Sequence, residues 1–433
     1  MKILVLYQID YFDVRNTINE HLFAFKNYDK KVQFHYFNIF NSIPKFLSKI
    51  RYDGIILHYT FLANRFSDNN ETWEGLIKNV KFLRGFKVAI PQDEYDKTYK
   101  LCNLFKEHGI KTVFTCFERQ EDYLKAYPFE KTGLENYIPV LTGYVDEKRI
   151  TELANKLIPF EERRIDIGYR ARKLPYYFGK HGQLKYELTN VFNSFLQNSK
   201  LKTDILNTDE SKTTTFYGND WYSFLINCKS FIGCEGGSSL LDWDGNVKIK
   251  VLEYIKQKPL ATFEETEENC FSSKDYNIRC FAISPRHFEA AITKTLQILV
   301  EGNYARIFKP GIHYIELKRD FKNIEEVIDK LADVNYCKKI IDNTYNDIVL
   351  SGKYSYSKFV ELVLDHIKEQ TIIDNNSLLN NLLFNLISIV NSIRNFIISI
   401  FMKIYSLFYE TNFYYKLKNN PKLFKAIKKL LPF

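Results

Sequence analysis

The chain has 433 residues, of which 45% are hydrophobic and 26% charged, and this length suits two or three domains with buried cores. Such a composition excludes an intrinsically disordered protein. The formal net charge is +9, but six lysines and no acidic residue follow Thr411, so the rest of the chain carries only +3. Positive charge concentrated in one tail predicts docking on a surface and argues against a nucleic-acid groove running over the whole molecule.

The first 145 residues alternate short apolar runs with helix-length amphipathic stretches. Strands are predicted at residues 3–7, 32–37, 54–59, 87–90 and 112–116, and helices at 14–25, 73–83 and 99–108. This alternation predicts a parallel sheet with helices on both faces. Since Asp10 soon interrupts the apolar start, we expect no signal peptide and a cytoplasmic protein, which suits seven scattered cysteines without a C-x-x-C pair.

A more polar stretch at residues 141–161 separates this first run from a second one. In the second run, strands are predicted at residues 165–169, 230–233, 280–283 and 314–317. We therefore predict an α/β fold of two Rossmann-like domains, over residues 1–145 and 146–370, the second binding a nucleotide. Ligands in doubly wound sheets bind beyond the carboxyl ends of the strands, so a site is expected between the domains.

Residues 371–433 are predicted to form an amphipathic, basic, helical tail. Between residues 377 and 407, apolar side chains recur at spacings of three and four, with Asn and Ser on the opposite side. Polar residues interrupt the apolar runs too often for a membrane-spanning helix. We expect the tail to lie peripherally on the anionic inner face of the cytoplasmic membrane, and packing on another protein or a second copy is the alternative.

The segment at residues 284–291 reads Ser-Pro-Arg-His-Phe-Glu-Ala-Ala and is predicted to begin a helix that ends near Glu301. Its Arg286, His287, Phe288 and Glu289 resemble the start of the donor-site helix in GT-B glycosyltransferases, especially a spore-coat-type group and uncharacterised bacterial surface-polysaccharide enzymes. The resemblance implies a GT-B architecture, donor contacts from these four residues, and hydrogen bonds from the donor ribose to Glu289. A carboxylate in the first turn of a helix also complements the helix dipole without any ligand.

A second segment with a predicted donor role follows the strand at residues 230–233. Gly236 and Gly237 allow the backbone to approach a ligand closely, and Ser238 or Ser239 can donate to an anionic oxygen. No G-K-[ST] follows, so this is not a Walker loop, and a structural turn is the simpler interpretation of glycines alone.

A third segment places three cations at the end of the strand at residues 165–169. GT-B enzymes commonly hold the leaving diphosphate with Arg or Lys at this place, so the resemblance gives that role to Arg170, Arg172 and Lys173, with Lys185 as a further candidate. Preorganised cations stabilise the charge that develops on the diphosphate. A solvated basic turn is the alternative.

Asp93 and Glu94, just beyond the strand at residues 87–90, are the candidates for the general base that deprotonates the acceptor hydroxyl. His58 and Asp10 follow other strands and are rivals for this role. A carboxylate after a strand can equally cap a helix, so the choice between them stays open.

Asp242-Trp243-Asp244 spells the D-x-D pattern with which GT-A glycosyltransferases bind a divalent metal. Because the chain is predicted to have two sheets and not the single sheet of GT-A enzymes, we expect a loop here, no metal and no cofactor. The chain also lacks the E-x7-E pair of better-known GT-B enzymes, since Phe281 and Gln297 stand eight residues from Glu289.

The expected function is therefore metal-independent transfer of a sugar from a nucleotide sugar to a lipid-linked glycan, surface glycan or protein during cell-envelope polysaccharide biosynthesis. No nucleic-acid partner is expected. A noncatalytic nucleotide- or carbohydrate-binding scaffold of the same fold is the alternative, and a basic nucleic-acid binder is a third possibility.

Overall fold

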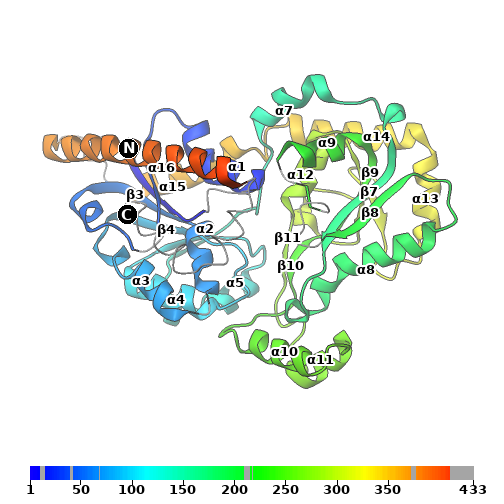
Figure 1. Ribbon diagram of the computed structural model, residues 1–433, viewed down its shortest axis with the longest axis horizontal. Coiled ribbons are helices and arrows are strands. Elements are labelled where there is room, and N and C mark those ends of the chain that lie inside the picture. The colour runs from blue at the N-terminus through cyan, green and yellow to red at the C-terminus, as the bar shows by residue number, and fades with distance from the viewer. Residues whose placement is uncertain are drawn as a thin grey trace.

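A computed structural model describes residues 1–9, 15–39, 42–67, 69–208, 215–216, 218–371 and 377–409, with the backbone alone at 397–399 and 401–409. Two α/β domains lie side by side, and each has a parallel sheet between helices (Figure 1). The rival base candidate Asp10 and the six tail lysines lie outside the described residues.

The N-terminal domain contains a six-stranded parallel sheet in the order β2-β1-β3-β4-β5-β6. Its strands are β1 (Lys2–Tyr7), β2 (Gln33–Asn38), β3 (Arg51–His58), β4 (Arg84–Ile90), β5 (Thr112–Thr115) and β6 (Asn136–Pro139). Its helices are α1 (Asn16–Tyr28), α2 (Tyr59–Leu62), α3 (Asn70–Ile77), α4 (Thr98–His108), α5 (Gln120–Ala126) and α6 (Phe129–Thr132). The five predicted strands and the helices predicted at 14–25 and 99–108 are confirmed within a few residues at their ends. The helix predicted at 73–83 ends earlier, at Ile77, and β6, α2, α5 and α6 were not predicted.

The C-terminal domain contains a five-stranded parallel sheet in the order β13-β12-β9-β7-β8. Its strands are β7 (Ile165–Arg172), β8 (Thr203–Thr208), β9 (Cys228–Gly233), β12 (Leu296–Val300) and β13 (Ile315–Leu317), and β10 (Gly236–Ser238) pairs antiparallel with β11 (Cys280–Ala282) in a separate ribbon. The helices are α7 (Glu147–Leu153), α8 (Gly179–Leu196), α9 (Asn219–Asn227), α10 (Asn246–Gln257), α11 (Phe263–Cys270), α12 (Pro285–Ile292), α13 (Ile324–Ala332) and α14 (Val334–Thr344). The strand predicted at residues 280–283 therefore belongs to the ribbon and not to the main sheet.

The predicted helix from residue 285 to Glu301 is wrong in its second half. Helix α12 ends at Ile292, Lys294 adopts a left-handed φ of 52°, and the chain then enters β12, which pairs with both β9 and β13. The hydroxyl of Thr293 donates to the carbonyl of Glu289, which satisfies an acceptor at the helix end. The apolar run that follows is buried on both faces, as strands inside a parallel sheet are.

The chain returns to the N-terminal domain at its end, which differs from the predicted boundary at residue 370. Helix α15 (Tyr356–Glu369) buries Phe359, Val363 and Ile367 in the core formed by β1, β3 and α1. Helix α16 (Leu378–Tyr409) lies along the same domain (Figure 1). No helix in the described ranges is both long enough and apolar enough to cross a bilayer.

Candidate functional site

The loop that follows β4 is tied to the start of α12 through the segment that links the two domains. The side-chain amide of Gln92 donates to the carbonyl of Thr142 at 3.0 Å, and the hydroxyl of Thr142 donates to the carbonyl of Ile283, just before α12. The predicted acceptor side and the predicted donor side therefore meet at the carboxyl ends of the two sheets, as expected for doubly wound domains.

Glu289 lies on α12 at this interface, but its predicted place in the first turn of the helix is wrong. Helix α12 begins at Pro285, so Glu289 is its fifth residue and not part of its first turn. Its carboxylate is almost completely buried, and its Oε2 accepts a hydrogen bond from the indole Nε1 of Trp221 at 2.7 Å. Burial raises the pKa of Glu289, whereas Trp221 and the nearby guanidinium groups of Arg286 and Arg149 lower it.

A group of cations faces the start of α12. Burial lowers the pKa of Lys185 on α8, and the charges of Arg286 and Arg15 lower it further, while Cys234 and Asp93 act in the opposite direction. Burial also lowers the pKa of Arg286, and Arg15 adds to that effect. Among the described residues no ion pair is formed by Lys185, Arg286 or Arg15, so three positive charges repel one another here, and an anion would relieve this repulsion.

Arg286 is held in place by neighbours from one strand and one helix. Its guanidinium donates to the carbonyl of Arg170 at the end of β7 and stacks on the ring of Trp221, 5.0 Å from the ring centroid. The same indole donates to Glu289, so one aromatic side chain orients both the cation and the carboxylate. Such preorganisation is what a site needs if it is to stabilise charge without rearranging.

The three cations predicted at the end of β7 do not share one location. The guanidinium of Arg170 is buried and makes a bidentate ion pair with Asp204 of β8, with both N–O distances 2.7 Å. It also donates to two backbone carbonyls, so its charge is already compensated by the protein. Arg172 and Lys173 are exposed, and the ammonium of Lys173 lies 4.6 Å from the ring centroid of Tyr186.

The predicted Gly-Ser segment forms strand β10 and the turn after it. Gly237 has φ of 98°, and a Cβ there would lie 1.7 Å from the carbonyl oxygen of Cys280, so glycine is required by the pairing of β10 with β11. The Ser238 hydroxyl donates to the carbonyl of Phe178 at 2.9 Å, and the Ser239 hydroxyl donates to Asp275 at 2.6 Å. Both hydroxyls are buried in these contacts, which fix the ribbon to the start of α8.

Gly236 is the residue of that segment that borders Lys185. It is partly exposed, as Gly237 is, and a Cβ at this position would lie 3.9 Å from the ammonium of Lys185. The backbone of Gly236 is therefore the part of this predicted donor-binding segment that borders the cation group.

His287 and Phe288 are buried in the packing of α12. Phe288 is fully buried in the core between α12 and the segment around Phe308. The Nδ1 of His287 contacts the Gln297 amide at 3.0 Å, and burial lowers the pKa of this imidazole to about 4, so it is neutral at pH 7. Their role in the structure is packing of α12 on β12, which positions Arg286 and Glu289.

Asp93 and Glu94 are adjacent in sequence but differ in environment. Asp93 is exposed, with a left-handed φ of 51°, and it accepts a hydrogen bond from the hydroxyl of Tyr95 at 2.9 Å. Glu94 is fully buried, and its two oxygens accept from Thr115, Tyr127 and the backbone of Cys116. Burial raises the pKa of Glu94 to about 7, although these three hydrogen bonds lower it.

The unusual backbone of this loop is maintained by a buried arginine. Arg65 donates to the carbonyls of Gln92 and Asp93, at 2.9 and 2.6 Å, and to that of Asp96 at 3.2 Å. A non-glycine residue in the left-handed region is strained, and such strain persists only where surrounding contacts impose it. Arg65 thus holds the Asp93 carboxylate at the interface.

The rival base His58 is not accessible. It is completely buried, its Nε2 lies 2.9 Å from Nδ1 of His21, and its Nδ1 contacts the hydroxyl of Thr60 at 2.9 Å. Burial holds the pKa of His58 well below its usual value, so the ring is neutral. It caps helix α2 by accepting from the backbone N–H of Thr60.

The two carboxylates of the D-x-D triplet serve as acceptors for the backbone at the start of α10. Asp242 accepts from the N–H groups of Val247 at 3.1 Å and Lys248 at 2.8 Å, and Asp244 accepts from that of Asn246 at 3.0 Å. The prediction of a loop at this triplet is confirmed. No cluster of three His, Cys, Asp or Glu side chains suited to a metal ion occurs among the described residues.

Three residues at this site were not predicted from the sequence: Arg15, Trp221 and Arg319. Arg15 precedes α1, and its charge acts on Glu289 and Lys185 in the other domain. Arg319 follows β13, and its charge acts on Glu235, a buried carboxylate at the end of β9. Arg15 and Arg319 come after predicted strands, but nothing local separated them from other surface cations. Trp221 follows β8, a strand that was not predicted.

No family model matches the chain, and no curated protein matches its sequence. Among solved structures, an α-glucosyltransferase in complex with UDP and a 13-mer DNA containing a central A:G mismatch is similar with a TM-score of 0.50 and 10% identity, over 85% of this chain and 99% of its own. Anabaena Alr3699/HepE in complex with UDP and glucose gives 0.47 and 10%, over 85% and 100%, and T4 phage BGT in complex with UDP and Mn²⁺ gives 0.46 and 9%, over 85% and 99%.

At these identities the likeness concerns the fold. The predicted architecture of two Rossmann-like domains in the GT-B arrangement is confirmed. The similar structure with the TM-score of 0.50 is that of an α-glucosyltransferase. The narrower spore-coat-type grouping stays a prediction.

Proposed function

We propose that this protein is a glycosyltransferase that uses a nucleotide-sugar donor. One observation carries the proposal: Lys185, Arg286 and Arg15 bring positive charge together beside Glu289, at the carboxyl ends of the strands, without ion pairs among the described residues. A diphosphate supplies the missing negative charge, and a ribose supplies hydroxyl donors for the Glu289 carboxylate, whose Oε1 accepts no hydrogen bond from the described residues.

The chemistry follows from where charge develops. When the bond between the sugar and the β-phosphate breaks, negative charge grows on the leaving diphosphate, and Lys185 and Arg286 stabilise that charge. Asp93 accepts the proton of the acceptor hydroxyl, since it is exposed and close enough for its charge to act on Lys185. Glu94, with both oxygens accepting hydrogen bonds inside the domain, supports the loop that carries Asp93.

The acceptor that we propose is a lipid-linked or surface glycan, with a protein as a further possibility, in cell-envelope polysaccharide biosynthesis. The support is helix α16, which exposes an apolar face suited to a membrane surface. We propose metal-independent transfer because the cations can neutralise the leaving group. The DNA in the similar α-glucosyltransferase complex makes DNA a useful comparison acceptor in the assay.

Lys185→Met tests the proposal, because methionine keeps the length of the side chain and removes its charge. We expect turnover of the accepted nucleotide sugar to fall about 100- to 1000-fold, as for the loss of one preorganised stabilising group. Lys180→Met is the matched control: Lys180 lies on the same helix but pairs with Glu264 on the surface, so its loss should change turnover less than about twofold.

A panel of UDP, GDP and CMP sugars separates the enzyme from the alternative of a noncatalytic scaffold. Tight nucleotide binding without hydrolysis or transfer of any sugar would favour the scaffold. Unchanged nucleotide binding and turnover in Lys185→Met would contradict the proposed site itself.

A further inference from the structure

Helix α16 is attached to the N-terminal domain by Phe384 and Ile387, which join the core of that domain, and by a row of polar side chains. Asn380 exchanges two hydrogen bonds with the backbone of Arg51, both at 2.9 Å. Further along, Asn391 and Arg394 donate to the carbonyls of Tyr36 and Asn38 in β2, at 3.0 and 2.8 Å. Strand β2 is at the edge of the sheet, so these side chains satisfy acceptors that no neighbouring strand covers.

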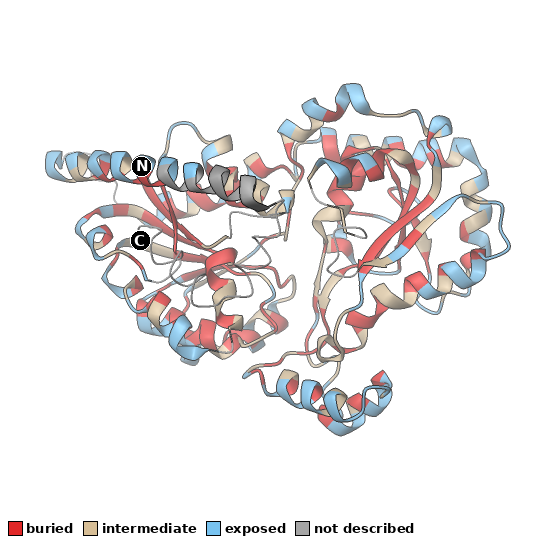
Figure 2. Ribbon diagram, in the orientation of Figure 1, coloured by how far each residue is buried: buried red, intermediate tan, exposed pale blue. Residues whose placement is uncertain are grey.

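The opposite side of α16 carries apolar side chains. Figure 2 shows exposed residues along the described part of this helix. Nine side chains on it are between 41% and 85% exposed: Leu378, Leu379, Leu382, Leu386, Ile389, Val390, Ile393, Phe396 and Ile400. The packed side of α16 also buries Phe384 and Ile387 in the core of the domain, so the exposed apolar side chains form a continuous stripe on the other side of the helix. Stripes of this kind mark contacts with another molecule or with a membrane.

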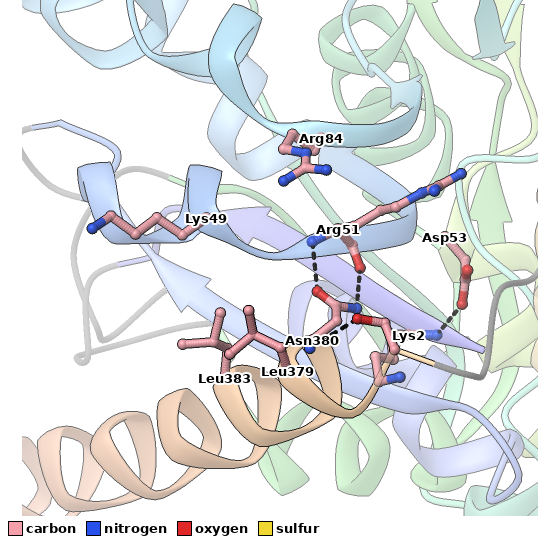
Figure 3. A pocket seen from close by; sticks show the side chains of 9 residues that line it. Lys2, Lys49, Arg51, Asp53, Arg84, Leu379, Asn380 and Leu383 are labelled. Carbon is pink, nitrogen blue, oxygen red and sulfur yellow. Dashed lines mark hydrogen bonds between the residues drawn. The ribbon is translucent and has the colours of Figure 1, made fainter.

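A basic pocket of about 180 Å³ lies where α16 begins (Figure 3). Four cationic side chains line it, from Lys2, Lys49, Arg51 and Arg84, against the single carboxylate of Asp53. Lys49, Arg51 and Arg84 are exposed, and no ion pair of theirs occurs in the described part of the chain. The positive end of the α16 dipole adds to this potential.

We propose that this basic pocket binds the phosphate of an anionic lipid headgroup while the apolar stripe of α16 enters the same leaflet. The stripe reaches the pocket, because Leu379 lines the pocket and also belongs to the stripe. A pocket suited to a phosphate thus lies next to a surface suited to acyl chains, as headgroups lie next to acyl chains in a leaflet. A free protein partner would not require three unpaired cations at the edge of its apolar contact.

The attachment also orients the enzyme on the leaflet. The contacts of α16 progress from Arg51, at the amino end of β3, to Asn38, at the carboxyl end of β2, so the helix runs toward the carboxyl edge of the sheet. Its 32 residues extend over about 48 Å at 1.5 Å per residue. A leaflet along this helix reaches the edge where the proposed site lies, which would bring a membrane-borne acceptor to it. This orientation rests on the proposed sugar transfer, whereas the headgroup pocket does not.

Vesicle flotation with the full chain tests the pocket, using phosphatidylcholine vesicles with and without 30% phosphatidylglycerol. Arg51→Gln with Arg84→Gln should weaken partition onto the anionic vesicles about 30-fold, because each basic residue near such a surface contributes about 1 kcal/mol. The matched control is Lys200→Gln with Lys202→Gln, which removes the same charge from an exposed loop of the C-terminal domain. It should change partition less than about threefold, and neither pair should alter the melting temperature.

Equal losses in the two variant pairs would overturn the pocket, because the attraction would then be a property of net charge. A dimer formed through α16 in the absence of vesicles, and broken by Leu382→Asn, would overturn the membrane as the occupant. Nucleotide binding measured on the same samples keeps the two proposals apart: a chain that binds anionic vesicles through the pocket but no nucleotide would refute sugar transfer alone.

Discussion

Glu94 in the N-terminal domain and Glu289 in the C-terminal domain are both buried carboxylates at the domain interface, yet their surroundings differ. Glu94 accepts three hydrogen bonds from side chains and backbone of its own domain. Glu289 accepts one, from Trp221, and the charges of Arg286, Arg149 and Arg15, which come from both domains, lower its pKa. Burial alone therefore does not identify a ligand-binding carboxylate, whereas unused acceptor capacity beside uncompensated positive charge does.

The largest expected effect of this difference is on stability. Glu94→Ala leaves three buried donors without an acceptor, and at about 1–3 kcal/mol for each unsatisfied group we expect a loss of about 4 kcal/mol. The melting temperature should fall by about 10 °C, as monitored by calorimetry. Glu289→Ala leaves only the indole N–H of Trp221 unpaired and should cost about 1 kcal/mol. Equal losses in the two variants would remove the distinction between them.

The pH dependence of stability gives a second measure of Glu94. Its pKa is raised from an ordinary value of 4.5 to about 7 in the folded protein, so the folded state binds this proton more tightly than the unfolded state does. Stability from this group is fully present below pH 4.5 and is lost as the pH rises to 7, by at most about 3 kcal/mol. The buried histidines act in the opposite direction, so the measurement is the difference between the wild type and Glu94→Gln in urea unfolding at pH 4.5, 5.5 and 7. The wild type should lose more stability than the variant over this range, and parallel curves would contradict the shift.

Nucleotide affinity should respond to Glu289 and not to Glu94. Glu289→Ala removes the proposed acceptor for the ribose hydroxyls, and a hydrogen bond to a charged group contributes about 1.5–3 kcal/mol, so the Kd should rise about 10- to 100-fold. Titration calorimetry with the nucleotide that binds the wild type provides the measurement. Glu94→Gln, which keeps the shape of the side chain, is the matched control and should change the Kd less than about threefold. The opposite ranking would move the donor site to the N-terminal domain.

Much of the fold could be predicted because the strands of both sheets are buried and apolar, as β1 and β9 are. The misses have local causes. Strand β8 reads Thr-Asp-Ile-Leu-Asn-Thr, which is too polar to signal a buried strand, and β12 follows α12 so closely that its apolar residues continue a helical spacing. The return of α15 to the first domain depends on packing against distant residues, and no pattern within residues 356–369 indicates it.

The site was harder to predict because charge compensation is a long-range property. In the sequence, Arg170 at the end of a strand and Lys185 in the following helix are equally good candidates for binding a diphosphate. The structure pairs Arg170 with Asp204, more than thirty residues away, and leaves Lys185 without a carboxylate partner among the described residues. The resemblance predicted the location of Glu289 near the start of a helix. The tertiary structure alone shows which carboxylates already accept hydrogen bonds and which cations already form ion pairs.

Asp242 extends the comparison to a third carboxylate and carries the smallest expected effect. Burial raises its pKa, and like Glu94 it has both oxygens occupied, here by the backbone N–H groups at the start of α10. Asp242→Ala should cost about 1 kcal/mol, as the loss of a helix cap does, and lower the melting temperature by about 2–4 °C. Its backbone bonds to Tyr95 and Lys97 remain in the variant, so the domain contact should survive. Turnover measured with and without added Mn²⁺ should stay within about twofold of the wild type. A metal-dependent loss would instead mean that a carboxylate whose oxygens both accept protein hydrogen bonds can still bind a ligand. The criterion that separates Glu94 from Glu289 would then fail.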